Sequence, residues 1–143
     1  MSRAEDIAEI VTAAHTLTRL AALETRNDAP AAQWRALSVL QTEGPLRVGA
    51  LATMTRTTQP GMTRLVGQLT ESGLVARESD PDDSRATVVT ITPAGVAALA
   101  EWRVELRAAL EPFFADLDDD DWKALSRVAR ILSARTTPVG AAR

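Results

Sequence analysis

The chain has 143 residues, a formal net charge of −3 at pH 7 and 45% hydrophobic residues, enough apolar content for one globular core. It has no cysteine and a single histidine, which excludes disulfides, thiol-based redox sensing and a thiolate or histidine-rich metal site within one protomer. Its first residues lack the apolar core of a signal peptide, and no apolar run approaches the roughly 18 residues that span a bilayer. We therefore expect a cytoplasmic protein that does not enter a membrane.

Charge is unevenly distributed along the chain. Between Arg47 and Arg77 there are four arginines and one acidic residue, whereas eight acidic residues stand against two arginines between Glu101 and Asp121. The net negative charge disfavours indiscriminate binding to nucleic acid. The locally basic middle of the chain nevertheless favours a nucleic-acid contact in that segment.

The first third of the chain is predicted to form three helices. Apolar residues recur every three or four positions between about residues 4 and 25, which is typical of an amphipathic helix. Helix breakers at residues 27–30 end it, and a second helix follows to about Thr42, before Gly44 and Pro45. The apolar segment from residue 46 to 54 is long enough for about two helical turns.

A fourth helix follows the polar cluster of residues 55–59. We expect Thr57 or Thr58 to cap this helix, and Pro60 occupies a first-turn position where proline is tolerated. The helix carries its apolar residues on one face and stops at Ser72 and Gly73, where a glycine suits a left-handed cap.

Two short strands come next. The β-branched run of residues 87–92 and the run of residues 74–78 predict strands, and the polar segment of residues 79–85 predicts the turn of a hairpin. Thr92 and Pro93 then start a long helix, which we expect to run to Leu117.

The C-terminal part is predicted to end in one more helix. Asp118 is a natural cap for it, and the aspartates of residues 118–121 favour capping and interaction with the helix dipole over a metal site. The helix ends near residue 135, and residues 136–143 are expected to be a disordered tail.

This order of elements predicts the fold class. Helices followed by a two-stranded ribbon are the winged helix-turn-helix arrangement, so we expect one mainly α domain over residues 1–143 with a small β-hairpin as its wing. The winged helix-turn-helix lobe covers about residues 30–95. The helices over about 4–25 and 94–135 carry more apolar surface than so small a core needs, which predicts dimerisation helices at both ends.

Two segments resemble the MarR family, the multiple-antibiotic-resistance regulators. The run from Leu51 to Val75, LATMTRTTQPGMTRLVGQLTESGLV, is similar to that family's two DNA-binding helices. The run from Asp80 to Gly95, DPDDSRATVVTITPAG, is similar to its wing, with the Asp-x-Arg and Thr-x-x-Gly patterns both present. The resemblance implies a homodimer that binds a pseudo-palindromic double-stranded DNA operator, usually as a repressor, and releases it when a small molecule binds.

A recognition helix in the major groove needs short polar side chains at its N-terminal end. Gln59 is the candidate reader of an adenine edge, Arg64 can reach guanine or phosphate, and Arg56 is expected to contact phosphate. Helix packing also explains Gly61, and a surface salt bridge to Glu71 also explains Arg64. The predicted DNA contacts from this helix and its preceding turn are Arg56, Thr57, Thr58, Gln59, Gly61, Thr63 and Arg64.

The wing is predicted to add Asp83, Ser84 and Arg85 to the DNA interface. The resemblance places Arg85 in the minor groove, whose negative potential attracts arginine, and has Asp83 orient the wing by a salt bridge. Without the resemblance, an arginine in an acidic turn is as well explained by solvation or local pairing. Asp80 and Asp82 make this turn more acidic than a DNA-binding loop needs.

Effectors of the family are often aromatic acids or phenols that lie between the DNA-binding lobe and the dimerisation helices. In this chain the candidate contacts are His15, Arg19, Trp34 and Trp102, because an arginine or histidine can hold a carboxylate while tryptophan supplies apolar area. An interface or core role also explains His15.

Other functional classes fit the sequence less well. It shows no nucleophile and base pair, no phosphate-binding loop and no metal-ligand spacing, so we expect neither an enzyme nor a cofactor. A protein-interaction module that uses a winged helix without DNA is the remaining alternative. The basic middle segment and the Asp-x-Arg wing favour a sequence-specific transcriptional regulator.

Overall fold

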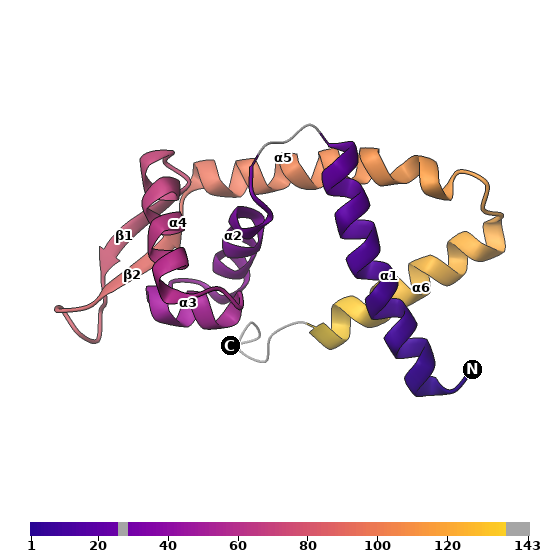
Figure 1. The fold of residues 1–143 in the computed structure, drawn as a ribbon, viewed down its shortest axis with the longest axis horizontal. Coiled ribbons are helices and arrows are strands. Elements are labelled where there is room, and N and C mark those ends of the chain that lie inside the picture. The colour runs from indigo at the N-terminus through magenta and orange to yellow at the C-terminus, as the bar shows by residue number, and fades with distance from the viewer. Residues whose placement is uncertain (26–28, 137–143) are drawn as a thin grey trace.

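The computed structural model describes residues 1–25 and 29–136, so the predicted tail lies almost entirely outside the described residues. The elements follow in the order α1, α2, α3, α4, β1, β2, α5, η1 and α6 (Figure 1). Their bounds are α1 Arg3–Glu24, α2 Ala31–Glu43, α3 Val48–Met54, α4 Gln59–Glu71, β1 Val75–Ser79, β2 Thr87–Ile91, α5 Pro93–Leu110, the 3-10 helix η1 Glu111–Phe114 and α6 Asp119–Thr136.

The elements are divided between two ends of an elongated molecule. Helices α2, α3 and α4 gather with the β-hairpin at one end, α1 and α6 lie toward the other, and α5 extends along the molecule between them (Figure 1). This arrangement confirms a mainly α, winged helix-turn-helix fold. Within the part of the chain that the structure describes, no helix is long and apolar enough to cross a membrane.

One hydrophobic core holds the winged helix-turn-helix lobe together. It combines side chains from α2, α3, α4, both strands and the first half of α5. Because these elements share one core, the α3–α4 pair and the hairpin are held in a fixed relative position. The largest fully buried members are Leu37, Leu40, Leu51, Met62, Val66, Leu69, Val75, Val89 and Leu99.

The hairpin has a third partner that the sequence did not indicate. Strands β1 and β2 pair antiparallel, and Leu46 forms a bridge to Val89 on the other side of β2. The Val89 amide donates to the Leu46 carbonyl at 2.7 Å, and the Leu46 amide donates back at 3.1 Å. The prediction that Leu46 belongs to the helical segment is wrong, because α3 begins at Val48. The Leu46 amide and carbonyl instead attach the chain before α3 to the wing.

The first strand begins one residue later than predicted. The Leu74 amide donates to the Leu69 carbonyl at 2.9 Å and so closes the end of α4 instead of starting β1. The Leu74 carbonyl accepts from the Thr92 amide at 3.1 Å, and Thr92 caps α5 through its hydroxyl. Gly73 has a φ of +76°, which confirms the left-handed position predicted after α4.

The prediction of one helix from Pro93 to Leu117 is wrong. Helix α5 ends at Leu110 and is followed by the short helix η1. Pro112 explains the break, because it has no amide hydrogen to donate to the preceding turn and its ring clashes with the carbonyl four residues earlier. The predicted cap of α6 is present, since the Asp121 amide donates to the Asp118 carboxylate at 2.8 Å.

Candidate nucleic-acid interface and effector cavity

The turn between α3 and α4 is fixed from inside the protein. Thr55 is buried, and its hydroxyl donates to the Leu51 carbonyl at 2.7 Å. The Thr57 amide donates to the Ala52 carbonyl at 2.9 Å. Between them Arg56 has a φ of +56°, a left-handed conformation that costs a non-glycine residue about 1–2 kcal/mol. The surrounding hydrogen bonds therefore hold a strained turn.

Of the two predicted caps of α4, it is Thr58 that caps the helix. Its hydroxyl accepts from the Gly61 amide at 3.1 Å, whereas the Thr57 hydroxyl contacts that of Thr55 at 3.2 Å. A Cβ atom at Gly61 would lie 2.9 Å from the Thr58 hydroxyl oxygen. Glycine at this position therefore leaves room for the cap, a reason that is local to the helix start.

The outer face of α4 is open to solvent at its N-terminal end. Gln59, Thr63 and Arg64 are exposed, and the Thr63 hydroxyl donates back to the Gln59 carbonyl at 2.9 Å. Among the described residues Arg64 forms no ion pair, so the alternative salt bridge to Glu71 is absent. Gln59, Thr63 and Arg64 are thus accessible from outside the lobe, whereas the buried residues of α4 are Met62, Leu65, Val66 and Leu69.

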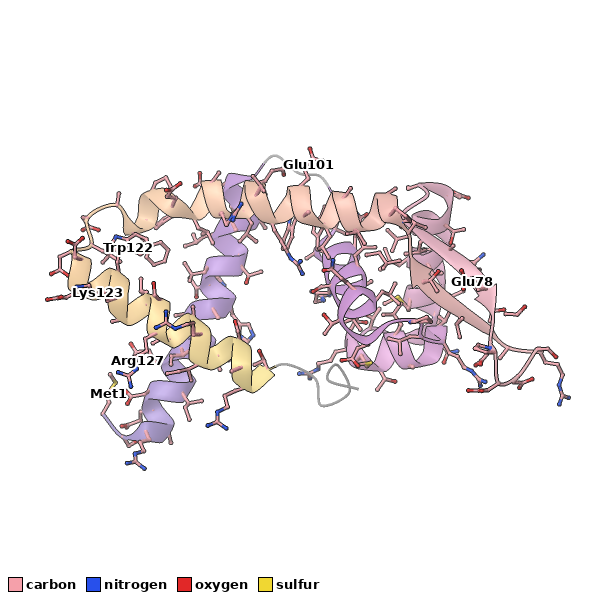
Figure 2. The ribbon with its side chains drawn as sticks, turned by 180° about the vertical axis from the view of Figure 1, so that it is seen from behind. Met1, Glu78, Glu101, Trp122, Lys123 and Arg127 are labelled. Carbon is pink, nitrogen blue, oxygen red and sulfur yellow. The ribbon has the colours of Figure 1, made fainter. Side chains whose placement is uncertain are left out.

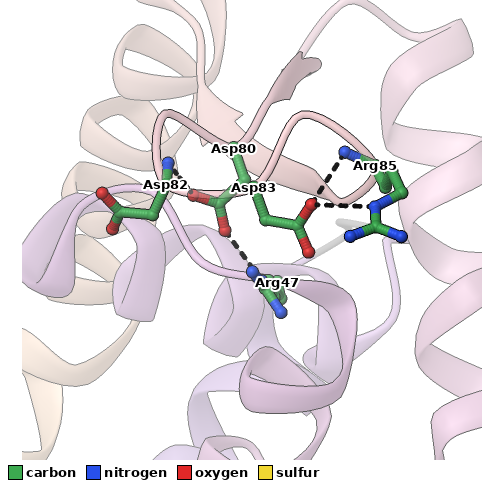
Figure 3. A network of polar contacts seen from close by, with 5 residues as sticks. All are labelled: Arg47, Asp80, Asp82, Asp83 and Arg85. Atoms are coloured by element: carbon green, nitrogen blue, oxygen red, sulfur yellow. Dashed lines mark hydrogen bonds and ion pairs between the residues drawn. The ribbon is translucent and has the colours of Figure 1, made fainter.

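The hairpin loop presents Arg85 to solvent. The Arg85 side chain is 94% exposed, and its Nε lies 3.7 Å from a carboxylate oxygen of Asp83 (Figure 3). The same Asp83 oxygen accepts from the Arg85 amide at 3.0 Å. The predicted salt bridge is therefore present, and it leaves most of the guanidinium free for another anion.

A second ion pair in the wing was not predicted. The Arg47 Nε donates to Asp80 at 2.8 Å, across 33 residues of sequence (Figure 3). The pKa of the Asp80 carboxyl lies below its ordinary value, first because the Asp82 amide donates to it and next because Arg47 does. From the sequence Asp80 is only excess negative charge in the turn, and no local pattern joins it to Arg47.

A cavity of about 470 Å³ opens between α1, α2, the α3–α4 turn and α5. Trp34 from α2 and Trp102 from α5 line it and are stacked, with ring centroids 5.2 Å apart and an interplanar angle of 14°. Arg35 and Arg56 also line the cavity. It can hold a planar apolar molecule against the indole rings with arginine side chains available for an anionic group.

The structure separates the four residues predicted to contact an effector. Trp34 and Trp102 meet in the cavity, whereas His15 and Arg19 are exposed on α1 and are not among the residues that line it. Thr18 is the first residue of α1 to line the cavity, so His15 lies almost one turn farther along and Arg19 about 100° around the helix. The basic side chains beside the tryptophans are instead Arg35 and Arg56. Arg35 directly follows Trp34 in the sequence, and this adjacency was the signal that could have identified it as a cavity residue.

Comparison with known proteins supports the same fold and family. Residues 27–86 match the model of the MarR family. An uncharacterized HTH-type transcriptional regulator of Mycobacterium leprae is 38% identical over 80 residues, which cover 51% of this chain and 56% of the relative. The first three curated relatives are matched over 56–59% of their length.

Solved structures resemble the chain over most of its length. The structure of a probable transcriptional regulator from Pseudomonas aeruginosa has a TM-score of 0.60 and 28% identity, and the match covers 86% of this chain and 92% of that one. BpsR of Bordetella bronchiseptica has a TM-score of 0.60 at 21% identity over 93% of this chain and 96% of its own. That second likeness concerns the fold alone. Taken with the model match and the curated relatives, these findings show that the chain is similar to MarR-family transcriptional regulators.

Proposed function

We propose that this chain is a homodimeric transcriptional regulator that binds double-stranded DNA. The observation that carries the proposal is the shared core of α4 and the hairpin, which fixes two exposed elements side by side on one lobe. The outer face of α4 fits the major groove, and Arg85, 94% exposed, is available for the adjacent minor groove.

Each exposed residue has a distinct task in this proposal. Gln59 and Thr63 at the start of α4 read base edges, because short or amide side chains at that position reach the floor of the major groove. Arg64 contacts guanine or phosphate, and Arg56 contacts phosphate. The N-terminus of α4 adds a favourable dipole for a phosphate group.

Uncovered apolar surface supports a homodimer. Every residue of α6 is exposed, including Trp122, which lies in the corner between the end of α5 and α6 (Figure 2). So many exposed large apolar side chains are unusual for a monomer, and a second copy of the chain would bury them. A twofold axis would then place two recognition helices on a pseudo-palindromic operator. The large exposed apolar residues of these end helices include Ile7, Ile10, Val11, Phe113, Trp122, Leu125, Val128, Ile131 and Leu132.

The cavity supports ligand-responsive repression by a small aromatic acid. Trp34 and Trp102 offer a stacked apolar wall, and Arg35 and Arg56 offer partners for a carboxylate. Arg56 also stands in the turn before α4, so a ligand that moves it changes the start of the recognition helix. The structure of BpsR concerns regulation of its DNA binding by 6-hydroxynicotinic acid, a ligand of this chemical kind. A regulator of this type works where the DNA is, in the cytoplasm.

Binding isotherms on operators selected from random double-stranded DNA test the proposal. Gln59→Ala should lose about 1–3 kcal/mol on the best operator and less on operators altered at the base it reads. Arg85→Ala should weaken binding to all of them and lower the salt slope by up to about two units per dimer, because two wings release fewer cations. Failure to select any DNA, or an Arg85→Ala protein with unchanged affinity and slope, would contradict it and favour a protein-interaction module.

A further inference from the structure

The wing is attached to the start of the helix-turn-helix by a side chain as well as by backbone. Arg47 is the N-terminal cap residue of α3, and its carbonyl accepts from the Leu51 amide at 3.0 Å. Its side chain leaves the helix and donates to Asp80, the first residue after β1, at 2.8 Å. One residue thus begins α3 and holds the loop that carries Arg85.

Asp80 makes several bonds at once. Its other carboxylate oxygen accepts from the Asp82 amide at 2.9 Å, and its own amide donates to the Ala86 carbonyl at 3.0 Å. Although the loop is on the surface, the Asp80 side chain is only 11% exposed. Asp80 therefore connects Arg47 directly to the backbone on both sides of the loop, next to Arg85.

The two attachments lie at different points along the hairpin. The backbone bridge joins Leu46 to Val89, which pairs with Arg77 in the middle of the strands. The ion pair acts beyond the end of β1, where the loop begins. A hairpin held only at Val89 can still bend beyond that point, whereas a second contact toward the tip limits this motion. A loop that is already ordered loses less conformational entropy when it binds.

We infer that Arg47 and Asp80 are positioning residues for DNA recognition, whose ion pair holds the wing loop so that Arg85 meets the minor groove while α4 occupies the major groove. The inference rests on the proposed DNA contact of Arg85. It gives Asp80 a role opposite to the one that its charge alone implies, because an isolated carboxylate beside DNA repels the phosphates.

The two roles predict opposite changes in DNA affinity when Asp80 loses its charge. By charge alone, Asp80→Asn removes a negative group near DNA and should tighten binding. By positioning, the same change loses the ion pair and should weaken binding. Asparagine has the same shape and can still accept from the Asp82 amide, so the turn itself is preserved. Asp82→Asn is the matched control, because among the described residues the Asp82 carboxylate accepts no hydrogen bond and points away from Arg47 and Arg85 (Figure 3).

The experiment measures the affinity of the full chain for one selected operator with four variants, which are Asp80→Asn, Asp82→Asn, Arg85→Ala and the Asp80→Asn/Arg85→Ala double variant. An ion pair at the protein surface contributes about two- to threefold per wing, so the Asp80→Asn protein should bind about four- to ninefold more weakly per dimer. Asp82→Asn should bind as well as the wild type or better. In the Arg85→Ala background Asp80→Asn should cost little, because no arginine remains to be positioned.

The outcomes separate the inference from the function it rests on. If Arg85→Ala weakens binding but Asp80→Asn binds as tightly as Asp82→Asn, the positioning role is wrong and the wing contact stands. An equal loss from Asp80→Asn with and without Arg85 also overturns it, since the effect would then not pass through Arg85. If Arg85→Ala leaves affinity unchanged, the proposed wing contact fails, and the inference fails with it.

Discussion

Leu125→Lys on α6 tests whether a second copy of the chain covers the terminal helices. Leu125 is 38% exposed in the protomer and shares an apolar stripe of α6 with Val128 and Leu132, each also exposed. Successive residues of a helix are separated by about 100°, so Ser126 points away from the middle of this stripe. Ser126→Lys therefore adds the same charge to the same helix at a neighbouring position.

The magnitude follows from the surface left to bury. Burying a leucine side chain fully contributes about 1.5–3 kcal/mol, and completing the burial of the 38% that is exposed would contribute about 0.6–1.1 kcal/mol per protomer. Both copies contribute, so loss of the side chain alone costs the dimer about 1–2 kcal/mol. An unpaired ammonium group in the same place adds a desolvation penalty of about several kcal/mol. Together these terms should raise the dimer dissociation constant by about a hundredfold or more.

Sedimentation equilibrium at micromolar concentration measures this directly. The wild type and Ser126→Lys should sediment as dimers, and Leu125→Lys should dissociate while its helical circular dichroism is largely retained. A Leu125→Lys protein that dimerises as tightly as the wild type would refute the reasoning. A wild-type protein that is a stable monomer would refute the dimer itself.

Three further results are expected. A Cβ at Gly95 would overlap the Leu74 carbonyl oxygen, so Gly95→Ala should destabilise the fold by about 1–3 kcal/mol. Gly67→Ala in the middle of α4 meets no such overlap and should stabilise the fold by about 0.5–1 kcal/mol. Equal melting temperatures of the two variants would contradict this. A small aromatic acid should quench tryptophan fluorescence and release operator DNA, and Trp102→Ala should abolish both; quenching without release would contradict the repressor mechanism. Because folding lowers the pKa of Asp80, the ionised carboxylate should stabilise the folded state above the usual aspartate pKa, and this contribution should be lost as pH falls through the lowered pKa. An NMR titration that gives the Asp80 carboxyl a pKa at or above the usual aspartate value would contradict this.

The parts of the fold that depend on neighbouring residues could be predicted from the sequence. Helical spacing of apolar residues, Gly73 after α4 and the Thr92 cap are local signals, and the structure has them where they were expected. The end of α5 also has a local signal, Pro112, although the apolar spacing that continues to Leu117 favours a longer helix.

The features that were missed depend on residues far apart in the chain. Nothing near Arg47 indicates Asp80, 33 residues away, and nothing near Leu46 indicates its bridge to Val89. The left-handed backbone conformation of Arg56 was missed for a different reason, because glycine, the usual sequence signal of a positive φ, is absent from this position. The cavity forms only when α1, α2 and α5 meet, so sequence identified its two tryptophans by type but could not show which basic residues stand beside them.

Hydroxyl-radical footprinting on a selected operator tests the mode of DNA recognition most directly, because it detects contacts along the minor groove and the backbone. Two recognition helices and two wings should give a footprint with twofold symmetry, in which outer minor-groove protections flank two major-groove sites. Arg85→Ala should lose the outer protections and keep the inner ones. An asymmetric footprint, or outer protections that persist without Arg85, would contradict a dimer that reads DNA with both α4 and the wing.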